Sequence, residues 1–190
     1  MQLILASSSP RRQALLRSTG FEFEVRPSSV VEESLPGEAP VTFVRRLAYE
    51  KAREVAARSR ADSLVLGADT SVVIDGGVLG KPGGREDASR MLRMLSGRSH
   101  QVLTGVCLVR APVQVKAVEH SITVVWFREL SAPEIEDYVS SGEPMDKAGA
   151  YAIQGRASRF VTRIEGCYSN VVGLPLSLVD EMLRRVVNAS

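Results

Sequence analysis

The 190-residue chain contains only two cysteines and two histidines. Cys107 and Cys167 lie far apart, and neither has a second cysteine or a histidine at the spacing of zinc ligands. The sequence therefore indicates neither a disulfide framework nor a zinc site, and we expect buried thiols. Neither His100 nor His120 lies at a spacing typical of a catalytic triad or a metal site, so we expect both to be structural or exposed.

The sequence also has little net charge and no long apolar run. The 24 Lys and Arg residues against 22 Asp and Glu residues leave a formal charge of +2, which gives no electrostatic reason to bind nucleic acid. No segment approaches the roughly 20 apolar residues that span a bilayer. The apolar run at residues 2–6 is too brief for a signal peptide and has no basic region before it. We therefore expect a cytoplasmic protein without nucleic-acid or membrane partners.

Three common catalytic and nucleotide-binding motifs are missing. The sequence has no G-x-S-x-G and no G-x-G-x-x-G, which argues against an esterase of that class and a standard dinucleotide fold. Gly80 and Lys81 resemble the end of a P-loop, but Pro82 stands where a magnesium-binding Ser or Thr belongs, and Asp75 stands where the first Gly belongs. A P-loop is therefore rejected, although Lys81 can still be a single charge that binds phosphate.

The hydrophobic content of 44% is enough for a substantial core, and no linker-like segment divides residues 1–190, so we expect a single domain. Hydrophobic periodicity and turn residues predict strands at 2–6, 21–26, 63–68, 99–110 and 117–129, a hairpin around residues 76–77, and helices at 10–20, 40–60, 85–96, 131–142 and after Pro175. Polar or glycine-rich loops are predicted at 27–39 and 143–150. Because strands and helices interleave, we expect an α/β or mixed α+β fold with a long central sheet.

The segment of residues 7–12 (SSSPRR) lies between a strand and a helix that begins with Ser9 as N-cap and Pro10 as first residue. Backbone N–H groups at a helix N-terminus favour anions, and Arg11 and Arg12 add guanidinium groups suited to phosphate oxygens. The segment can therefore bind phosphate. Equally, it can be an ordinary capped helix whose arginines face solvent.

Two further charged positions are candidates for chemistry. Asp69, before Thr70, follows the predicted strand 63–68 and can serve as a general base or a metal ligand, or simply form a turn. Lys51 lies on the apolar stripe of the helix 40–60, where its charge needs a partner or a polar cleft, unless it extends to the rim. Glu33 in the preceding loop can pair with Lys51 or a metal, or remain solvated.

Five segments together resemble the Maf family of nucleotide pyrophosphatases: LILASSSPRRQALL, VLGADTSVV, LGKP, LSGRSHQVLTGVCL and GEPMDKAGAYAIQG, with the resemblance continuing to VVGLPL. The resemblance implies a fold related to inosine triphosphate pyrophosphatases, with an elongated mixed sheet, two lobes and an active-site cleft. It also implies a divalent cation, Mg²⁺ or Mn²⁺, and hydrolysis of a nucleoside triphosphate at the α-phosphorus. A homodimer is expected on the same grounds.

The resemblance also implies roles for individual residues. Asp69 corresponds to the proton acceptor, and Arg12, Glu33, Lys51 and Lys81 correspond to other charged active-site positions. Asp69 and Glu33 are the expected metal ligands, with Glu33 alternatively a partner in the activation of water. Ser9, Arg11 and Arg12 are expected to bind substrate.

Three positions resemble the family's pyrimidine-specific subgroup: Arg11, Thr70 and Gln154. An amide such as Gln154 can both donate to and accept from a uracil or thymine edge. We therefore expect dTTP and UTP as substrates, with modified pyrimidine triphosphates left open. The alternatives are a 7-methyl-GTP pyrophosphatase and a nucleotide-binding regulator of cell division and septum formation that binds without turnover.

Overall fold

The structure is a computed structural model that describes residues 2–188. Within this range the chain forms two compact units. Unit 1 comprises residues 2–70, 104–121 and 173–188, and unit 2 comprises Ser71–Leu103 and Ile122–Val172. Three strands pass through both units: β3 (Ser63–Ile74), β5 (Ser99–Arg110) and β6 (Gln114–Phe127). That residues 1–190 form one domain stays a prediction.

The sheet in unit 1 has the strand order β2-β1-β3-β5-β6. β1 (Gln2–Leu5) runs parallel to β2 (Phe23–Val25) on one side and to β3 on the other. Its pairing with β3 ends where Leu5 lies opposite Leu66. Since β3 continues beyond this point, the residues that follow Leu66 lie past the end of their parallel neighbour.

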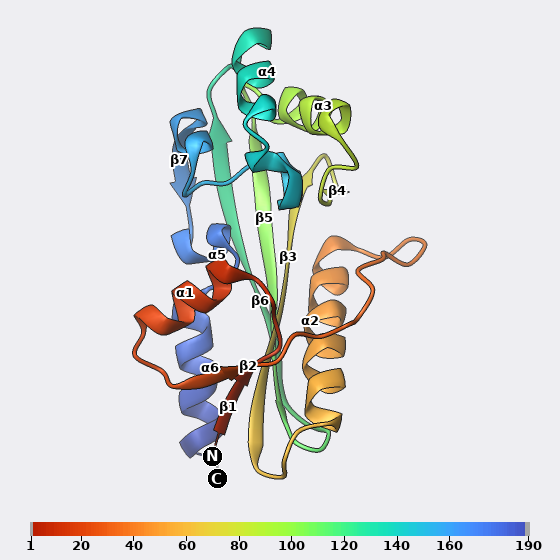
Figure 1. Cartoon of the computed structure of the whole chain (residues 1–190), viewed down its shortest axis with the longest axis vertical. Helices are drawn as coiled ribbons and strands as arrows, with labels where there is room; N and C mark the ends of the chain where they lie inside the picture. Colours follow the sequence, from red (N-terminus) through yellow and green to blue (C-terminus); the bar gives the residue numbers. More distant parts are fainter. Residues whose placement is uncertain (1, 189–190) are drawn as a thin grey trace. The chain divides into compact units, whose positions relative to one another are not determined.

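Helices cover both faces of the unit 1 sheet (Figure 1). α1 (Pro10–Ser18) and α6 (Leu176–Asn188) pack on the face formed by the even-numbered β3 residues Leu64, Leu66 and Ala68. α2 (Pro40–Ala57) packs on the opposite face, where Val65 is buried. Strand side chains alternate between the two faces of a sheet. In this part of β3, odd-numbered residues therefore face α2, and even-numbered residues face α1 and α6.

Two glycines allow α2 to lie directly against the strands. A Cβ atom on Gly67 of β3 would come within 2.2 Å of the Ala48 carbonyl oxygen, and one on Gly105 of β5 would come within 2.1 Å of the Val44 carbonyl oxygen. Such distances are far below van der Waals contact, so only glycine fits at either position. The close approach places the middle of α2 next to the residues that follow Gly67.

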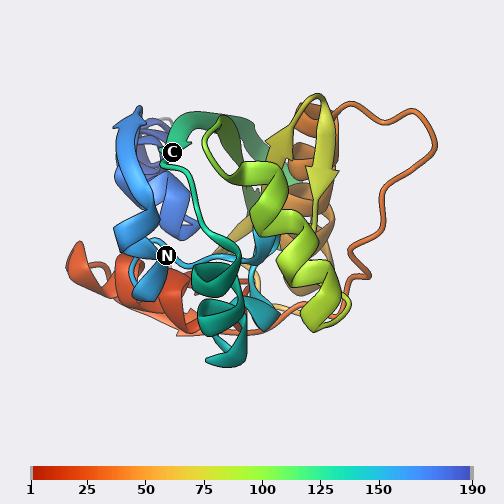
Figure 2. The ribbon, with the colours of Figure 1, turned by 90° about the horizontal axis from the view of Figure 1, so that it is seen from above.

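Unit 2 contains antiparallel pairings and short helices. β4 (Gly77–Leu79) pairs with β3, and β7 (Val161–Glu165) pairs with β6. α3 (Arg85–Leu95) packs against α4 (Ala132–Ser140), and the two helices lie side by side in Figures 1 and 2. The other helices of unit 2 are η1 (Glu143–Asp146), η2 (Ala148–Ala150), η3 (Arg156–Phe160) and α5 (Tyr168–Val172). The combination of parallel and antiparallel pairs confirms the predicted mixed α/β class.

Two element predictions are wrong. The strand predicted at 63–68 continues to Ile74, because the segment after Thr70 is a buried run rich in β-branched residues that extends β3. Asp69 therefore lies inside a strand and not after its end. The predicted loop at 143–150 contains the short 3₁₀ helices η1 and η2.

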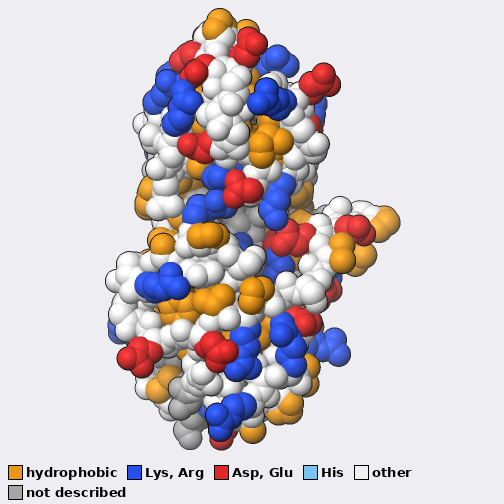
Figure 3. All heavy atoms as spheres, in the orientation of Figure 1, with side chains coloured by type: hydrophobic (Ala, Val, Ile, Leu, Met, Phe, Trp, Pro, Cys, Tyr) orange, Lys and Arg blue, Asp and Glu red, His pale blue; other side chains and the backbone are white. Residues whose placement is uncertain are grey.

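The surface agrees with the balanced composition. On the face drawn in Figure 3, basic and acidic side chains are interspersed, in keeping with a formal net charge of +2. Among residues 2–188, no helix combines the length and the apolar character that crossing a bilayer requires.

Candidate active site

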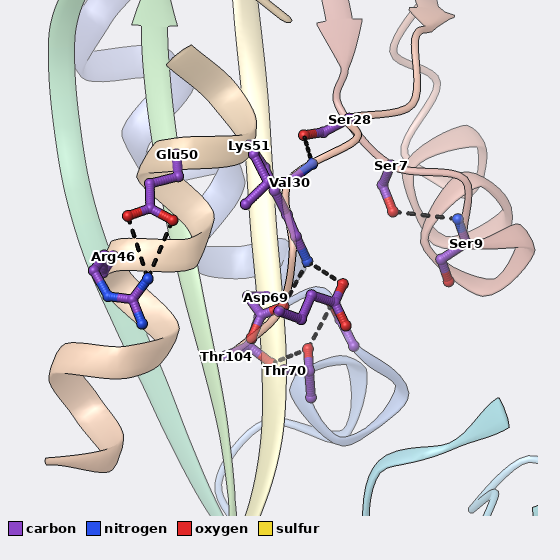
Figure 4. Close-up of polar contacts among 12 residues, drawn as sticks. Ser7, Ser9, Ser28, Val30, Arg46, Glu50, Lys51, Asp69, Thr70 and Thr104 are labelled. Atoms are coloured by element: carbon purple, nitrogen blue, oxygen red, sulfur yellow. Dashed lines mark hydrogen bonds and ion pairs between the residues drawn. The ribbon is translucent and has the colours of Figure 1, made fainter. Parts of the chain in front are cut away.

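A buried ion pair joins α2 to β3 in unit 1. Asp69 has the parity of Val65 and Gly67, so its side chain points toward α2, where Lys51 lies one helical turn after Leu47. The Lys51 ammonium nitrogen is 2.6 Å from Oδ1 of Asp69 (Figure 4). Lys51 is 6% exposed and Asp69 5% exposed. Charges this deeply buried are tolerated when each compensates the other, so the interior position expected for Lys51 is explained by Asp69.

A second carboxylate reaches the same ammonium group. Oε1 of Glu32, in the loop between β2 and α2, lies 2.5 Å from the Lys51 ammonium nitrogen. Glu33, which the sequence indicates as a partner of Lys51 or of a metal, or else as a solvated residue, does not make this contact: its side chain is exposed, and its backbone carbonyl accepts a hydrogen bond from Arg46. The two glutamates are adjacent in an irregular loop, and no periodicity indicates which one points inward.

The other face of β3 meets the N-terminus of α1. Ser9 is the N-cap of α1 as predicted, and its hydroxyl accepts from the backbone N–H of Arg12. The Arg12 guanidinium donates to the carbonyl of Gly173 (2.8 Å), the hydroxyl of Thr70 (3.0 Å) and the hydroxyl of Ser7 (3.3 Å). Each of these acceptors is an uncharged oxygen, so the positive charge is held in place without a carboxylate in these contacts.

The buried environment affects the Arg12 guanidinium. Desolvation lowers its pKa from the usual value, and the negative charges of Asp69 and Glu32 act in the opposite direction. A guanidinium group nevertheless remains protonated at any physiological pH. Arg12 therefore supplies a fixed positive charge near the two carboxylates.

Thr70 links Arg12 to the neighbouring strand. Its hydroxyl lies 2.9 Å from that of Thr104 on β5, which is fully buried, and 3.3 Å from the Gly173 carbonyl. Thr104 and Gly173 are not among the residues predicted from the sequence. Two features of the sequence could have indicated them. Thr104 is the one hydroxyl residue in the buried stretch of β5. Gly173 is a glycine, and it adopts a φ of +125° that other residues rarely adopt.

The remaining predicted positions divide between the two units. Arg11 is half-buried in the first turn of α1 in unit 1. Lys81 and Gln154 belong to unit 2, and both side chains are exposed. Of the nine predicted site residues, the structure brings Lys51 and Asp69 into contact, and it joins Ser9, Arg12 and Thr70 by hydrogen bonds.

The donor set around Lys51 suits a hard divalent cation. Mg²⁺ is usually bound through one or two carboxylates, with water and substrate phosphate oxygens completing its coordination. Asp69 and Glu32 supply two such carboxylates, both directed at one point. Within the described part of the chain, no group of three or more His, Cys, Asp or Glu residues is placed to hold a metal ion. The residues present thus offer two carboxylate ligands to such a cation.

Comparisons with known proteins cover nearly the whole sequence. The family model described as Maf-like protein matches residues 2–186. A dTTP/UTP pyrophosphatase of Koribacter versatilis is 55% identical over 97% of this chain and 94% of its own length, and one of Symbiobacterium thermophilum is 56% identical over 96% and 92%. A dTTP/UTP pyrophosphatase of Geobacter sulfurreducens is 53% identical over 97% and 96%. A solved dITP/XTP pyrophosphatase of Mycobacterium abscessus is 18% identical, with a TM-score of 0.44 over 70% of this chain and 76% of that one.

Proposed function

Since the chain belongs to the Maf family, as its motifs predict, we propose that it is a pyrophosphatase that hydrolyses dTTP and UTP to the nucleoside monophosphate and pyrophosphate. Full-length relatives more than half identical to it carry that activity in their names. The structural observation that carries the proposal is the convergence of two carboxylates, Asp69 and Glu32, on the Lys51 ammonium. A protein that only bound a nucleotide would need the cations but not this carboxylate pair.

Each residue of this cluster has a proposed task. Asp69 accepts a proton from water as the water oxygen bonds to the α-phosphorus and the bond from that phosphorus to the bridging oxygen of the β-phosphate breaks. Lys51 and Arg12 offset the negative charge that develops on the phosphate oxygens. Ser9 and Arg11, at the N-terminus of α1, help to hold the triphosphate where backbone N–H groups favour anions. Pyrophosphate leaves with the negative charge.

We further propose that Asp69 and Glu32 hold a divalent cation, Mg²⁺ or Mn²⁺. When bound, such a cation neutralises triphosphate oxygens and makes the α-phosphorus easier to attack. Glu32 replaces Glu33 in this role because it is Glu32 that points toward Asp69's partner Lys51. Lys51 orients both carboxylates for this task.

Unit 2 contributes two residues to the proposal. Lys81 adds a phosphate-binding charge, and Gln154 reads the pyrimidine edge. Arg11 and Thr70 are the other two positions proposed to determine the choice of base. Gln154 is exposed, so its amide is accessible to a nucleotide base. The protein is also proposed to act as a homodimer without nucleic-acid partners, which sedimentation of the purified chain would test.

A panel of nucleoside triphosphates tests the function. dTTP, UTP, CTP, GTP and 7-methyl-GTP are incubated with the protein and Mg²⁺ or Mn²⁺, and pyrophosphate is separated from phosphate as product. Release of pyrophosphate from dTTP and UTP is expected. Preference for 7-methyl-GTP would favour the sister activity, and nucleotide binding without product would favour a regulator.

The matched variant is Asp69→Asn, which is nearly isosteric but cannot accept the proton. It should retain the fold and lose turnover by about 10²-fold or more. Wild-type turnover in the folded variant would remove Asp69 from its proposed role.

A further inference from the structure

The loop that carries Glu32 has little structure of its own. Residues 26–39 contain no helix or strand, and Val31 and Leu35 are 69% and 56% exposed. In the ribbon of Figure 1 the loop extends away from α2 before it returns to the start of that helix. A carboxylate on such a segment samples many positions unless other contacts restrict it. The Glu32 carboxylate can therefore stay at Lys51 only if further contacts hold the loop in place.

Arg46 of α2 supplies this attachment. Its Nε and Nη2 donate to the two carboxylate oxygens of Glu38, each at 2.7 Å, and Nη2 also donates to the backbone carbonyl of Glu33 at 2.9 Å. Its Nη1 lies 3.2 Å from both carboxylate oxygens of Glu50, one turn along the helix (Figure 4). One guanidinium thus joins the helix to two points of the loop, of which the Glu33 carbonyl directly follows Glu32.

The Glu38 side chain is well sheltered for a charged group. It is only 5% exposed, and it also accepts from the backbone N–H of Leu35 at 3.1 Å, while its own backbone N–H donates to the Leu35 carbonyl. Paired, two-point contacts of this kind restrict geometry more than a single ion pair does. The hydrogen bonds and charges of Glu38 and Glu50 raise the pKa of Arg46, so the clamp does not change with pH in the physiological range.

Lys51 and Arg46 lie on the same helix, five residues apart, so one rigid element fixes these two attachment points of the loop. At the start of the loop, Arg58 at the end of α2 also donates to the Pro27 carbonyl. We infer that Arg46 and Glu38 form a clamp that positions the Glu32 carboxylate against Lys51 and Asp69 for the reaction. This inference rests on the proposed function. Arg46 is a positioning residue: it contacts the loop, Glu50 and the Phe43 ring, and it acts through Glu32.

The test compares Arg46→Gln with Arg53→Gln. Arg53 is exposed on the same helix, so its replacement removes an equal charge without a described contact to the loop. Kinetics on dTTP over a range of Mn²⁺ concentrations should show that Arg46→Gln raises the half-maximal Mn²⁺ concentration about tenfold, the size typical when a residue that supports a metal ligand is lost. Arg53→Gln should change it less than twofold.

A second readout does not depend on turnover. Amide hydrogen exchange of the metal-free protein should accelerate about tenfold in residues 30–38 of the Arg46→Gln variant, with the core of α2 unchanged. Arg53→Gln should exchange like wild type. If Arg46→Gln does not fold, Glu38→Gln takes its place, because it breaks the same clamp and leaves the Arg46 contact with Glu50.

A double-mutant cycle identifies the route of the effect. In a Glu32→Gln background, Arg46→Gln should lower kcat/KM by less than twofold further, because the residue that it positions is already gone. The inference would be overturned if Arg46→Gln lowered kcat/KM as much in the Glu32→Gln background as in the wild type. It would also be overturned if hydrogen exchange in residues 30–38 accelerated in Arg46→Gln while the half-maximal Mn²⁺ concentration stayed unchanged. Absence of dTTP and UTP hydrolysis by the wild type would refute the proposed function instead, and hydrogen exchange would still decide whether the clamp exists.

Discussion

Replacing Lys51 by Met removes a positive charge from between two carboxylates and keeps an apolar stem of similar length. Breaking a buried ion pair by removing one partner costs about 3–5 kcal/mol, because the remaining charge is left uncompensated. The Glu32 side chain is 42% exposed and can turn toward water, whereas that of Asp69 is 7% exposed and cannot. Arg12 attracts Asp69 and offsets part of the cost, so we expect the lower end, about 3 kcal/mol.

The assay is urea unfolding at pH 7.5 of the wild type, Lys51→Met, Asp69→Asn and the double variant. The amide that replaces the Asp69 carboxylate in the double variant carries no charge, so this variant should be at most about 1 kcal/mol less stable than Asp69→Asn, which means a coupling of about 2 kcal/mol or more. Additive costs, with a coupling below about 0.5 kcal/mol, would refute the view that Lys51 compensates Asp69. Hydrolysis should fall in Lys51→Met even when rates are corrected for the folded fraction.

Three other changes test separate parts of the structure. Gly67→Ala would place a methyl group 2.2 Å from the Ala48 carbonyl oxygen, so thermal or urea unfolding should show a loss of about 3 kcal/mol, whereas Gly83→Ala, with open space around it, should cost little; equal stabilities would contradict the close packing of α2. Burial lowers the pKa of His100 to about 4, below the roughly 6.5 of an unfolded chain, so the unfolded state takes up the proton first and stability falls as pH drops from about 6.5 toward 4. Unfolding free energies should decrease by about 2 kcal/mol more in wild type than in His100→Gln between pH 7 and pH 5, and parallel pH profiles would remove the assignment. Gln154→Glu should reduce kcat/KM for UTP and dTTP by the equivalent of about 1–3 kcal/mol relative to CTP and 7-methyl-GTP; unchanged ratios would show that Gln154 does not read the base.

Local patterns were sufficient for the elements that have a strong period or a capping residue. The apolar stripe of residues 40–60 predicted α2, and the Ser9-Pro10 pair predicted the start of α1 to the residue. The same stripe placed Lys51 on the inner face of its helix, and the structure finds it buried there. These features depend on residues three or four apart, which the sequence displays directly.

The errors fall where a distant contact outweighs a local preference. Asp69 was expected to end its strand, because an acidic residue after a buried run usually marks a turn. Its charge is instead compensated by Lys51, which lies on another element, so β3 continues through it to Ile74. Which of Glu32 and Glu33 contacts Lys51 likewise depends on another element, since Arg46 of α2 binds the Glu33 carbonyl and the Glu38 carboxylate.

Motifs and short-range periodicity were enough to predict the family and the mixed α/β class, and they indicated Arg12, Lys51 and Asp69 as candidate site residues. Which side chains meet became known from the folded chain alone. Gly67 and Gly105 allow α2 to lie directly against the sheet. The alternation of side chains along β3 then points Asp69 toward Lys51 and Thr70 toward Arg12. The carbonyl of Gly173, far away in the sequence, accepts a further hydrogen bond from Arg12. Such pairings depend on packing between elements far apart in the chain, and no local pattern encodes them.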